Sequence, residues 1–137
     1  MQKNDQAFGV IPLRQNHGKI ELLLVHHQKG HWAFPKGHAE KNEMPLETAT
    51  RELAEEVHLE VSKLLDTPPL IEHYTFNENQ TTINKEVHYF IAFVTGDLVC
   101  QKEEIREAKW CTFDQAKKQA TFSETRSLVD QVIEKLS

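Results

Sequence analysis

Three glutamates crowd into little more than one turn of a predicted helix in the stretch RELAEEVHLE, residues 51–60. Glu52, Glu55 and Glu56 stand three and four positions apart, where like-charged side chains on a helix repel by roughly a few tenths of a kcal/mol per pair. Carboxylates near a helix C-terminus also oppose the helix macrodipole. We therefore expect something positively charged to lie among them.

The position of these glutamates on the helix distinguishes a binding site from a plain acidic face. At about 100° per residue, Glu52 and Glu56 border the apolar stripe, whereas Glu55 points further out beside Arg51. The stripe itself contains Leu46, Ala49, Thr50, Leu53 and Val57. A solvated acidic face is the common alternative, but carboxylates beside the core, directly after a glycine-containing loop, favour a binding site.

Clustered carboxylate oxygens are the ligands of hard divalent cations such as Mg²⁺ or Mn²⁺, which keep several waters and bridge to substrate phosphates. Such ions neutralise phosphate oxygens and lower the pKa of an attacking water, and a spare carboxylate can act as the base. Glu43, ahead of the helix, can reach Arg51 and so fix the orientation of the neighbouring carboxylates. The cluster thus predicts metal-dependent chemistry on a diphosphate substrate.

Two strands precede this helix. Residues 7–15 and 20–28 are rich in apolar and β-branched side chains and are separated by the turn-like NHGK, which predicts a hairpin. Irregular backbone follows in GHWAFPKGHAEKNE, and helical periodicity then runs over residues 44–57 with Pro45 in the first turn. The hairpin and the loop are the elements that must position the glutamates.

The second half of the chain returns to strands and closes with helices. Strands are predicted at residues 70–76 and 85–96, separated by the polar turn NENQTTIN, and a short strand is predicted at 108–113. Asp114 is expected to cap a short helix over 115–120, and Ser123 a final helix that ends at Leu136. In that last helix Leu128, Val129, Val132, Ile133 and Leu136 form one apolar packing face.

This order of strands, helix, strands and helices favours an α/β (α+β) fold in which a mixed sheet is packed between helices, over a doubly wound parallel sheet. At 137 residues the chain is long enough for one domain, residues 1–137, with a sizeable core. No internal repeat or low-complexity linker interrupts it.

Composition restricts the partners. Lys and Arg number 16 against 21 Asp and Glu, a net charge of −5, and the basic residues are scattered, which disfavours extended nucleic-acid binding. Cys100 and Cys111 lack metal-type spacing, the N-terminus lacks the apolar stretch of a signal peptide, and no apolar run approaches the ~20 residues that span a bilayer. We expect a cytoplasmic, reduced monomer that does not bind membranes.

The spacing around the glutamates resembles a known motif. Gly37, five residues, Glu43, seven residues, RELAEE and then Leu59 resemble the nudix box, G-x5-E-x7-R-E-U-x-E-E-x-G-U with U aliphatic, at every fixed position but one. The stretches FPKGHAE, KEVHYFIAFV and EEIREAKW and the closing helix extend the resemblance over nearly the whole chain. Within the nudix family, they resemble the asymmetric diadenosine tetraphosphate hydrolases.

The resemblance implies a nudix fold, an α/β/α sandwich around a mixed sheet, and hydrolysis of a nucleoside diphosphate linked to a further group. It implies that Glu52, Glu55 and Glu56 bind one to three Mg²⁺ or Mn²⁺ ions, with Glu56 as the leading candidate base and the Gly37 carbonyl as a further ligand. Glu104 matches a position that supplies an extra carboxylate. Glu103 and Glu86 compete with Glu104 for that role.

The one departure from the box is His58, which stands where the motif has its second glycine. That glycine is interpreted as the left-handed C-cap of the helix, where a residue with a Cβ costs up to roughly 1 kcal/mol and histidine is among the less penalised replacements. Stability is therefore expected to suffer more than catalysis.

Polyphosphate also needs cationic protein groups, and the fold that the resemblance implies would bring four basic residues near the site. Lys36, next to Gly37, is the strongest candidate, and His31, His38 and Lys85 are the others. A polar surface histidine or a solvated lysine at a strand end is the alternative for each of the last three. His26 and His27 are adjacent, so they point to opposite faces of a strand and make a poor chelating pair.

An adenine base needs a flat, partly exposed ring on which to stack, a contact worth on the order of 1–3 kcal/mol per base. Tyr89 and Phe122 match the aromatic positions that clamp adenine in the hydrolases resembled, and Tyr74 and Trp32 are weaker candidates. Burial in the core is the alternative, above all for Tyr89 in its apolar strand.

Three functions are compatible with these observations. The leading hypothesis is an asymmetric hydrolase that releases ATP plus AMP from diadenosine tetraphosphate. The second keeps the box but changes the substrate to a nucleoside triphosphate or the 5′ end of an RNA, and the low basic content argues against RNA. The third is a nucleotide-binding module without turnover, and the intact set of glutamates counts against it.

Overall fold

The structure is a computed structural model that describes all 137 residues. Its elements are β1 (Gln2–Asn16), β2 (Lys19–His27), β3 (Trp32–Ala33), β4 (Lys36–Gly37), α1 (Pro45–Val57), β5 (Glu60–Leu64), β6 (Leu70–Glu78), β7 (Thr81–Thr95), β8 (Ile105–Cys111), α2 (Phe113–Gln119) and α3 (Ser123–Leu136). The predicted strands, central helix and final helices all form, but β1 begins five residues and β7 four residues earlier than expected.

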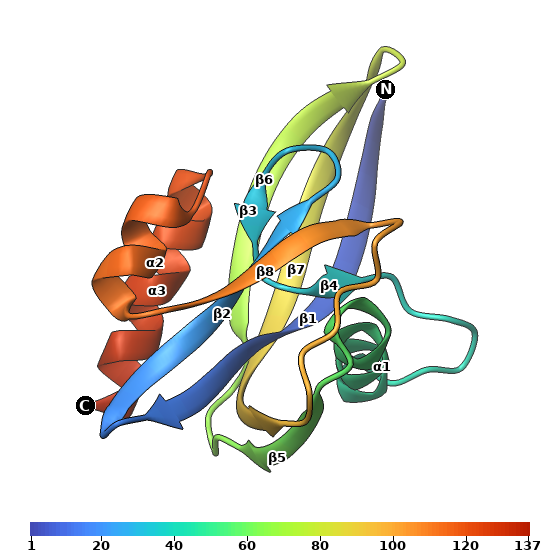
Figure 1. The fold of residues 1–137 in the computed structure, drawn as a ribbon. Helices are drawn as coiled ribbons and strands as arrows, with labels where there is room; N and C mark the ends of the chain where they lie inside the picture. Colours follow the sequence, from blue (N-terminus) through green and yellow to red (C-terminus); the bar gives the residue numbers. More distant parts are fainter.

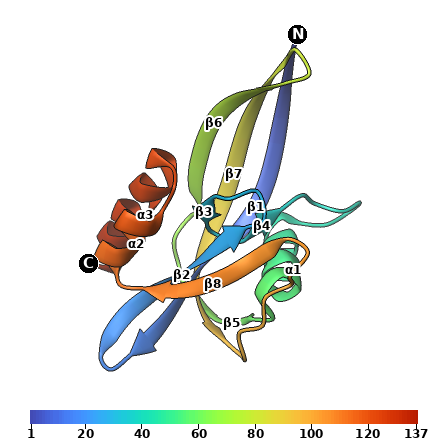
Figure 2. The ribbon, with the colours of Figure 1, turned by 45° about the horizontal axis from the view of Figure 1, so that its top comes forward.

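A mixed sheet runs through the middle of the molecule, as predicted. Strand β1 pairs in parallel with β7 over most of its length, while the hairpin partner β2 and the shorter strands pair antiparallel. The order is β3-β2-β1-β7-β5, with β4 on β1, β6 on β7 and β8 on β2. Helix α1 lies on one side and α2 with α3 on the other (Figures 1 and 2).

Two hydrophobic clusters fill the spaces between sheet and helices, because β7 is apolar on both faces. Val87, Tyr89 and Ile91 face the cluster that includes α2 and α3, whereas Phe90 and Ala92 face the cluster that includes α1. The predicted packing face of α3 contributes Leu128, Val129 and Val132 to the first cluster, with Ile133 and Leu136 at its border.

The buried face of α1 differs from the predicted stripe. Ala49, Leu53 and Val57 are buried as expected, but Leu46 is 36% exposed in the first turn. Glu56, expected only to border the core, is 2% exposed. The buried face is therefore rotated toward Glu52 and Glu56, relative to the stripe predicted from hydrophobicity alone.

Helix ends confirm one expectation and correct two. His58 ends α1 in the left-handed conformation at φ 61° and ψ 30°, the role predicted for the missing glycine. The cap of α2 is Thr112, whose Oγ1 accepts from the Gln115 N–H, so the prediction of Asp114 was wrong. Ser123 is likewise inside α3, after Phe122 at the cap position.

One region of the sheet extends beyond the helices, and we call it the arm: residues 2–6 of β1, 81–86 of β7 and 73–78 of β6. The N-terminus and the β6–β7 turn lie together at its tip (Figure 1). That turn contains only Asn79 and Gln80, both at positive φ, so it is much tighter than the predicted loop NENQTTIN.

Candidate active site

A pocket of about 520 Å³ lies where α1, β4 and the loop before β8 meet. It collects eight of the residues that the sequence singled out: His31, Lys36, Gly37, His38, Arg51, Glu52, Glu56 and Glu104. Acidic and basic side chains therefore line the same cavity. The carboxylates come from α1 and the loop before β8, whereas the basic groups come from β4, from the segments before and after it, and from Arg51 of α1.

Arg51 is the positive group that the crowded glutamates require. Its guanidinium donates to both oxygens of Glu43 at 2.6 and 3.0 Å, to Glu52 at 3.0 Å and to Glu55 at 3.1 Å. It also donates to the His38 carbonyl at 2.9 Å. The hydrogen bond to Arg51 holds the pKa of Glu43 down at about 2, which keeps this carboxylate ionised. Glu43 and Glu55 do not line the pocket and contact it only by hydrogen bonds with Arg51, which was the prediction for Glu43.

Gly37 leaves room for the carboxylate of Glu52. A Cβ built on Gly37 would lie 2.1 Å from the Glu52 Cδ, so any other residue would force this carboxylate away from its present position. The missing side chain lets β4 pass directly over the carboxylate. Strand β4 and helix α1 therefore lie in direct contact at Gly37 and Glu52, two fixed positions of the motif.

Glu56 is the deepest carboxyl group of the pocket and the least satisfied. Both of its oxygens are fully buried and have no hydrogen-bond partner. Burial first, and then the neighbouring carboxylates Glu52 and Glu104, raise its pKa far above the ordinary range, with Lys36 opposing the shift. An unpaired buried carboxylate is costly unless a proton or a cation compensates it.

The third carboxylate near Glu56 comes from the loop before β8. Glu103 and Glu104 both line the pocket, but Glu104 is the one whose charge acts on Glu56. The third candidate, Glu86, lies on the arm, where it pairs with His88 and accepts from Gln6. These positions support Glu104 over its two competitors as an additional ligand.

The donor set fits a divalent cation in chemistry, although the carboxylates are not gathered around one point. No group of three or more His, Cys, Asp or Glu side chains is close enough in the structure to hold a metal ion. Glu52 and Glu55 are instead turned toward Arg51. The orphaned oxygens of Glu56 are the observation that favours a cation here, because hard cations take carboxylate oxygens as ligands.

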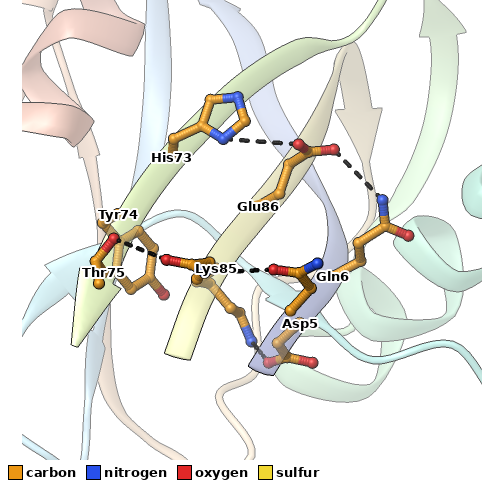
Figure 3. Close-up of a pocket in the computed structure, with 9 residues that line it drawn as sticks. Asp5, Gln6, His73, Tyr74, Thr75, Lys85 and Glu86 are labelled. Carbon is orange, nitrogen blue, oxygen red and sulfur yellow. Dashed lines mark hydrogen bonds and ion pairs between the residues drawn. The ribbon is translucent and has the colours of Figure 1, made fainter. Parts of the chain in front are cut away.

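The lysine and histidines lie opposite the carboxylates. Burial lowers the pKa of Lys36, helped by Lys85, while Glu56 and Glu72 act against the shift. Lys85, only 7% exposed, donates to Asp5 at 2.6 Å (Figure 3), and His38 contacts the same carboxylate at 3.0 Å. Lys85 therefore lies behind His38 at the edge of the pocket instead of lining it.

Comparisons with known proteins decide the family. The NUDIX domain model matches residues 3–132. The chain belongs to the nudix family. It is 32% identical over 127 residues to the asymmetrical bis(5′-nucleosyl)-tetraphosphatase of Caenorhabditis elegans, across 90% of this chain and 91% of that protein. It is also 38% identical over 96 residues to mRNA-decapping enzyme subunit 2 of Arabidopsis thaliana, but this covers only 24% of that protein.

Among solved structures, the binary complex of the C. elegans Ap4A hydrolase superposes with a TM-score of 0.75 at 26% identity, over 96% of both chains. The protein is thus a nudix hydrolase related to the asymmetric tetraphosphatases, and both its fold class and its hydrolase assignment match the sequence prediction. Nudix hydrolases generally use divalent metal ions. No helix of this one has the length and apolar character needed to cross a bilayer.

The aromatic candidates of this nudix hydrolase fall into different places. Tyr89 is 1% exposed and packs edge-on against Phe34 in the core, so the expectation of a partly exposed ring was wrong for it. Phe122 is 48% exposed and lies against His31, at the rim of the pocket. It remains a candidate for base stacking.

The other two candidate rings, Tyr74 and Trp32, belong to strands β6 and β3. Tyr74 is half-buried and stacks on Phe76, which belongs to the same strand. Trp32 stacks on His26 at 4.6 Å between centroids and packs against the core, so it takes no part in lining the nudix pocket.

The pocket of this nudix hydrolase also contains residues that sequence reasoning missed. His27 lies under His31 with the rings 4.3 Å apart, and its Nε2 is buried without a partner. Burial, then the charges of His31 and Lys36, lowers the pKa of His27 to about 3, so the ring is neutral. The signal that could have found it is its position at the end of the second predicted strand, directly before the loop to the box.

Proposed function

We propose that this nudix hydrolase cleaves dinucleoside tetraphosphates asymmetrically, with diadenosine tetraphosphate as substrate and ATP plus AMP as products. The observation that carries the proposal is the buried, unpaired Glu56 opposite Lys36, within a chain that matches an asymmetrical tetraphosphatase almost end to end. The exposed ring of Phe122 supplies a surface for a nucleobase, and so does the exposed Phe76 with the half-buried Tyr74 that stacks on it.

The residues divide the work as follows. Lys36 would offset the negative charge of the phosphate chain, and the ring N–H groups of His31 and His38 would donate to it. Lys85 and Asp5 hold His38 from behind. Arg51 holds Glu52 and Glu55 in orientation. Divalent ions, Mg²⁺ or Mn²⁺, would be held by Glu52, Glu55, Glu56 and Glu104 with the Gly37 carbonyl, and would polarise phosphorus and acidify water.

Glu56 is the residue that we propose to accept the proton. Water adds to phosphorus, the bond from that phosphorus to the bridging oxygen breaks, and the proton of the water moves to a Glu56 carboxylate oxygen. Its burial excludes bulk water from the proton acceptor. Because its raised pKa would leave Glu56 protonated at neutral pH in the metal-free protein, Glu56 can act as the acceptor only when the positive charges of Lys36 and of bound divalent ions ionise it.

The test is a product assay. Purified protein is mixed with diadenosine tetraphosphate and Mg²⁺, and the nucleotides are separated by ion-exchange chromatography. We expect equal amounts of ATP and AMP, with turnover reduced by several orders of magnitude in Glu56→Gln and unchanged in Glu60→Gln, whose side chain is exposed on β5. Nucleotide binding should survive in Glu56→Gln. Intact dinucleotide with the wild-type protein would overturn the proposal.

One alternative is favoured by a specific observation. The similarity to an mRNA-decapping subunit points to the 5′ end of an RNA, or to a nucleoside triphosphate, as substrate. The net charge of −5 counts against a long RNA. The same assay with triphosphorylated RNA and with nucleoside triphosphates separates these substrates from the dinucleotide.

A further inference from the structure

Glu104 reaches the catalytic pocket from the loop between β7 and β8, although it belongs to no helix or strand. Its backbone is held on both sides. Its N–H donates to the carbonyl of Gln101 at 3.1 Å and to the side-chain Oε1 of that residue at 3.0 Å. Its carbonyl accepts from the N–H of Gln28 at 2.8 Å. Because the N–H of Gln101 donates in turn to the Glu56 carbonyl at 2.9 Å, the loop is fixed between the end of α1 and the end of β2.

Gln28, directly after β2, makes the contacts on the β2 side. Its side-chain Nε2 donates to the Lys102 carbonyl at 2.8 Å. Its side-chain Oε1 accepts from Nε of Arg106 at 3.2 Å, and its carbonyl accepts from Nη2 of the same guanidinium at 2.8 Å. With the backbone bond to Glu104, every polar group of Gln28 is therefore bonded to residues 102–106. The fixed directions of the guanidinium donors suit two acceptors on one residue.

Strand β8 has one residue more than β2 at the same place. His27 lies opposite Ile105 and His26 opposite Glu107, which leaves Arg106 as an extra residue. Such a β-bulge bends its strand and re-aims the side chains beside it, and bulges are frequent next to active sites. Because the guanidinium of Arg106 is bound to the residue after β2, the bulge and the loop before it are held in one orientation.

The carboxylate of Glu104 is the part of this loop that has no partner. No hydrogen bond or ion pair of the structure involves its side-chain oxygens, and it lines the pocket in which its charge acts on Glu56. Arg106 does not line the pocket, so its guanidinium is not placed to bind phosphate. Gln28 does line it, but both polar atoms of its side chain are bonded to the loop.

We propose that Gln28 and Arg106 are positioning residues, which hold the Glu104 carboxylate in the pocket beside Glu56 for binding of a divalent cation. The inference rests on the proposed function, in which Glu104 is an additional metal ligand. It gives a role to a hydrogen-bonded pair outside the nudix box. Groups that orient a metal ligand contribute typically about 10- to 100-fold to metal affinity.

Binding of Mn²⁺ to the protein without nucleotide tests this role, with free Mn²⁺ measured by electron paramagnetic resonance. Arg106→Gln and Gln28→Ala should each weaken Mn²⁺ binding on the order of 10-fold. Loss of positive charge alone predicts the opposite for Arg106→Gln, because a nearby cation repels the metal ion. Lys109→Gln is the matched control, since it removes an exposed charge from the same strand, and it should not weaken binding. Unchanged or tighter binding in Arg106→Gln would overturn the inference.

A double-mutant cycle decides whether the pair acts through Glu104. Glu104→Gln alone should weaken Mn²⁺ binding, and Arg106→Gln should cause no further loss in that background. A further loss without the carboxylate would show a general effect on the fold and would overturn the inference, as would a wild-type protein that binds no Mn²⁺. No substrate enters these measurements, so they decide the role of the pair even where the product assay rejects diadenosine tetraphosphate.

Discussion

At the scale of single residues, the site depends on Arg51. Its guanidinium donates to three carboxylates and one carbonyl and pairs with a fourth carboxylate, that of Glu40, at 3.6 Å. Lysine has the same charge but lacks the planar fork of donors, so it cannot hold Glu43 and Glu52 at once. We expect Arg51→Lys to lower kcat by roughly 10- to 100-fold and to raise the metal concentration needed for half-maximal turnover.

Steady-state kinetics over a Mg²⁺ titration measures both effects. Arg14→Lys is the matched control, because Arg14 also pairs with a glutamate, Glu21, and lies over Trp110 far from the pocket. Its kcat should not change. An Arg51→Lys protein with wild-type kcat and metal dependence would show that the positive charge alone suffices.

The same scale shows what sequence could not supply. The motif spacing identified Glu52, Glu56 and Lys36 correctly as pocket residues, because a helix and a short loop fix their positions locally. The burial of Tyr89 and Glu72 depends instead on β6 and β7 pairing and on α3 covering them. Those contacts join residues far apart in sequence, so no local pattern reveals them.

At the scale of elements, α1 ends at a residue whose backbone conformation is unfavourable for a side chain with a Cβ. His58 sits at φ 61°, where a Cβ is unfavourable and glycine is not. We expect His58→Gly to raise the free energy of unfolding by about 0.5–1 kcal/mol in urea denaturation, with kcat unchanged. Asn42→Gly, at φ 66°, should gain less because asparagine tolerates this region. Equal effects of the two changes would contradict the explanation.

The first turn of α2 gives a second test at this scale. Thr112 caps the helix through its side chain, whereas Ser123 of α3 lies inside its helix. Thr112→Ala should cost about 1 kcal/mol of stability in thermal or urea unfolding, and Ser123→Ala less than about 0.5 kcal/mol. The opposite ranking would restore the cap positions that the sequence suggested.

Element prediction from sequence was accurate where periodicity was strong. The β1–β2 hairpin, α1 and α3 carry apolar patterns that match their geometry, and each formed as expected. Strand β5 was missed because its side chains are mostly exposed and leave no alternating pattern. The two-residue strands β3 and β4 form only because β2 and β1 provide partners, a contact that the local sequence does not encode.

At the scale of the whole molecule, carboxyl groups in different parts of the structure meet opposite electrostatic surroundings. The arm stabilises charge, because the hydrogen bonds from His38 and Lys85 outweigh the burial of Asp5 and lower its pKa to about 2. Burial has the opposite effect on Glu56 in the pocket and on Glu72 of β6, because it disfavours their charged forms and raises their pKa values. Binding of a cation or a base near these groups would offset that cost, so ligands should stabilise the protein.

The cost of Glu72 can be measured in the free protein. Its pKa is about 7 when folded and 4.5 in the unfolded reference, so the folded state holds a proton that the unfolded chain has released between these values. Stability from this group is complete below pH 4.5 and is lost as pH rises to about 7. Glu72→Gln removes this loss, so relative to wild type it should become more stable with rising pH, by on the order of 1–3 kcal/mol above pH 7.

Urea denaturation at pH 5, 6, 7 and 8 measures that difference, with Glu78→Gln as the exposed reference whose difference from wild type should stay flat. A difference for Glu72→Gln that is also flat would show that Glu72 titrates alike in both states and is open to water. A rising difference would show instead that folding holds the carboxyl group away from water at a free-energy cost. Such a cost at a position that packing does not require is typical of a functional site.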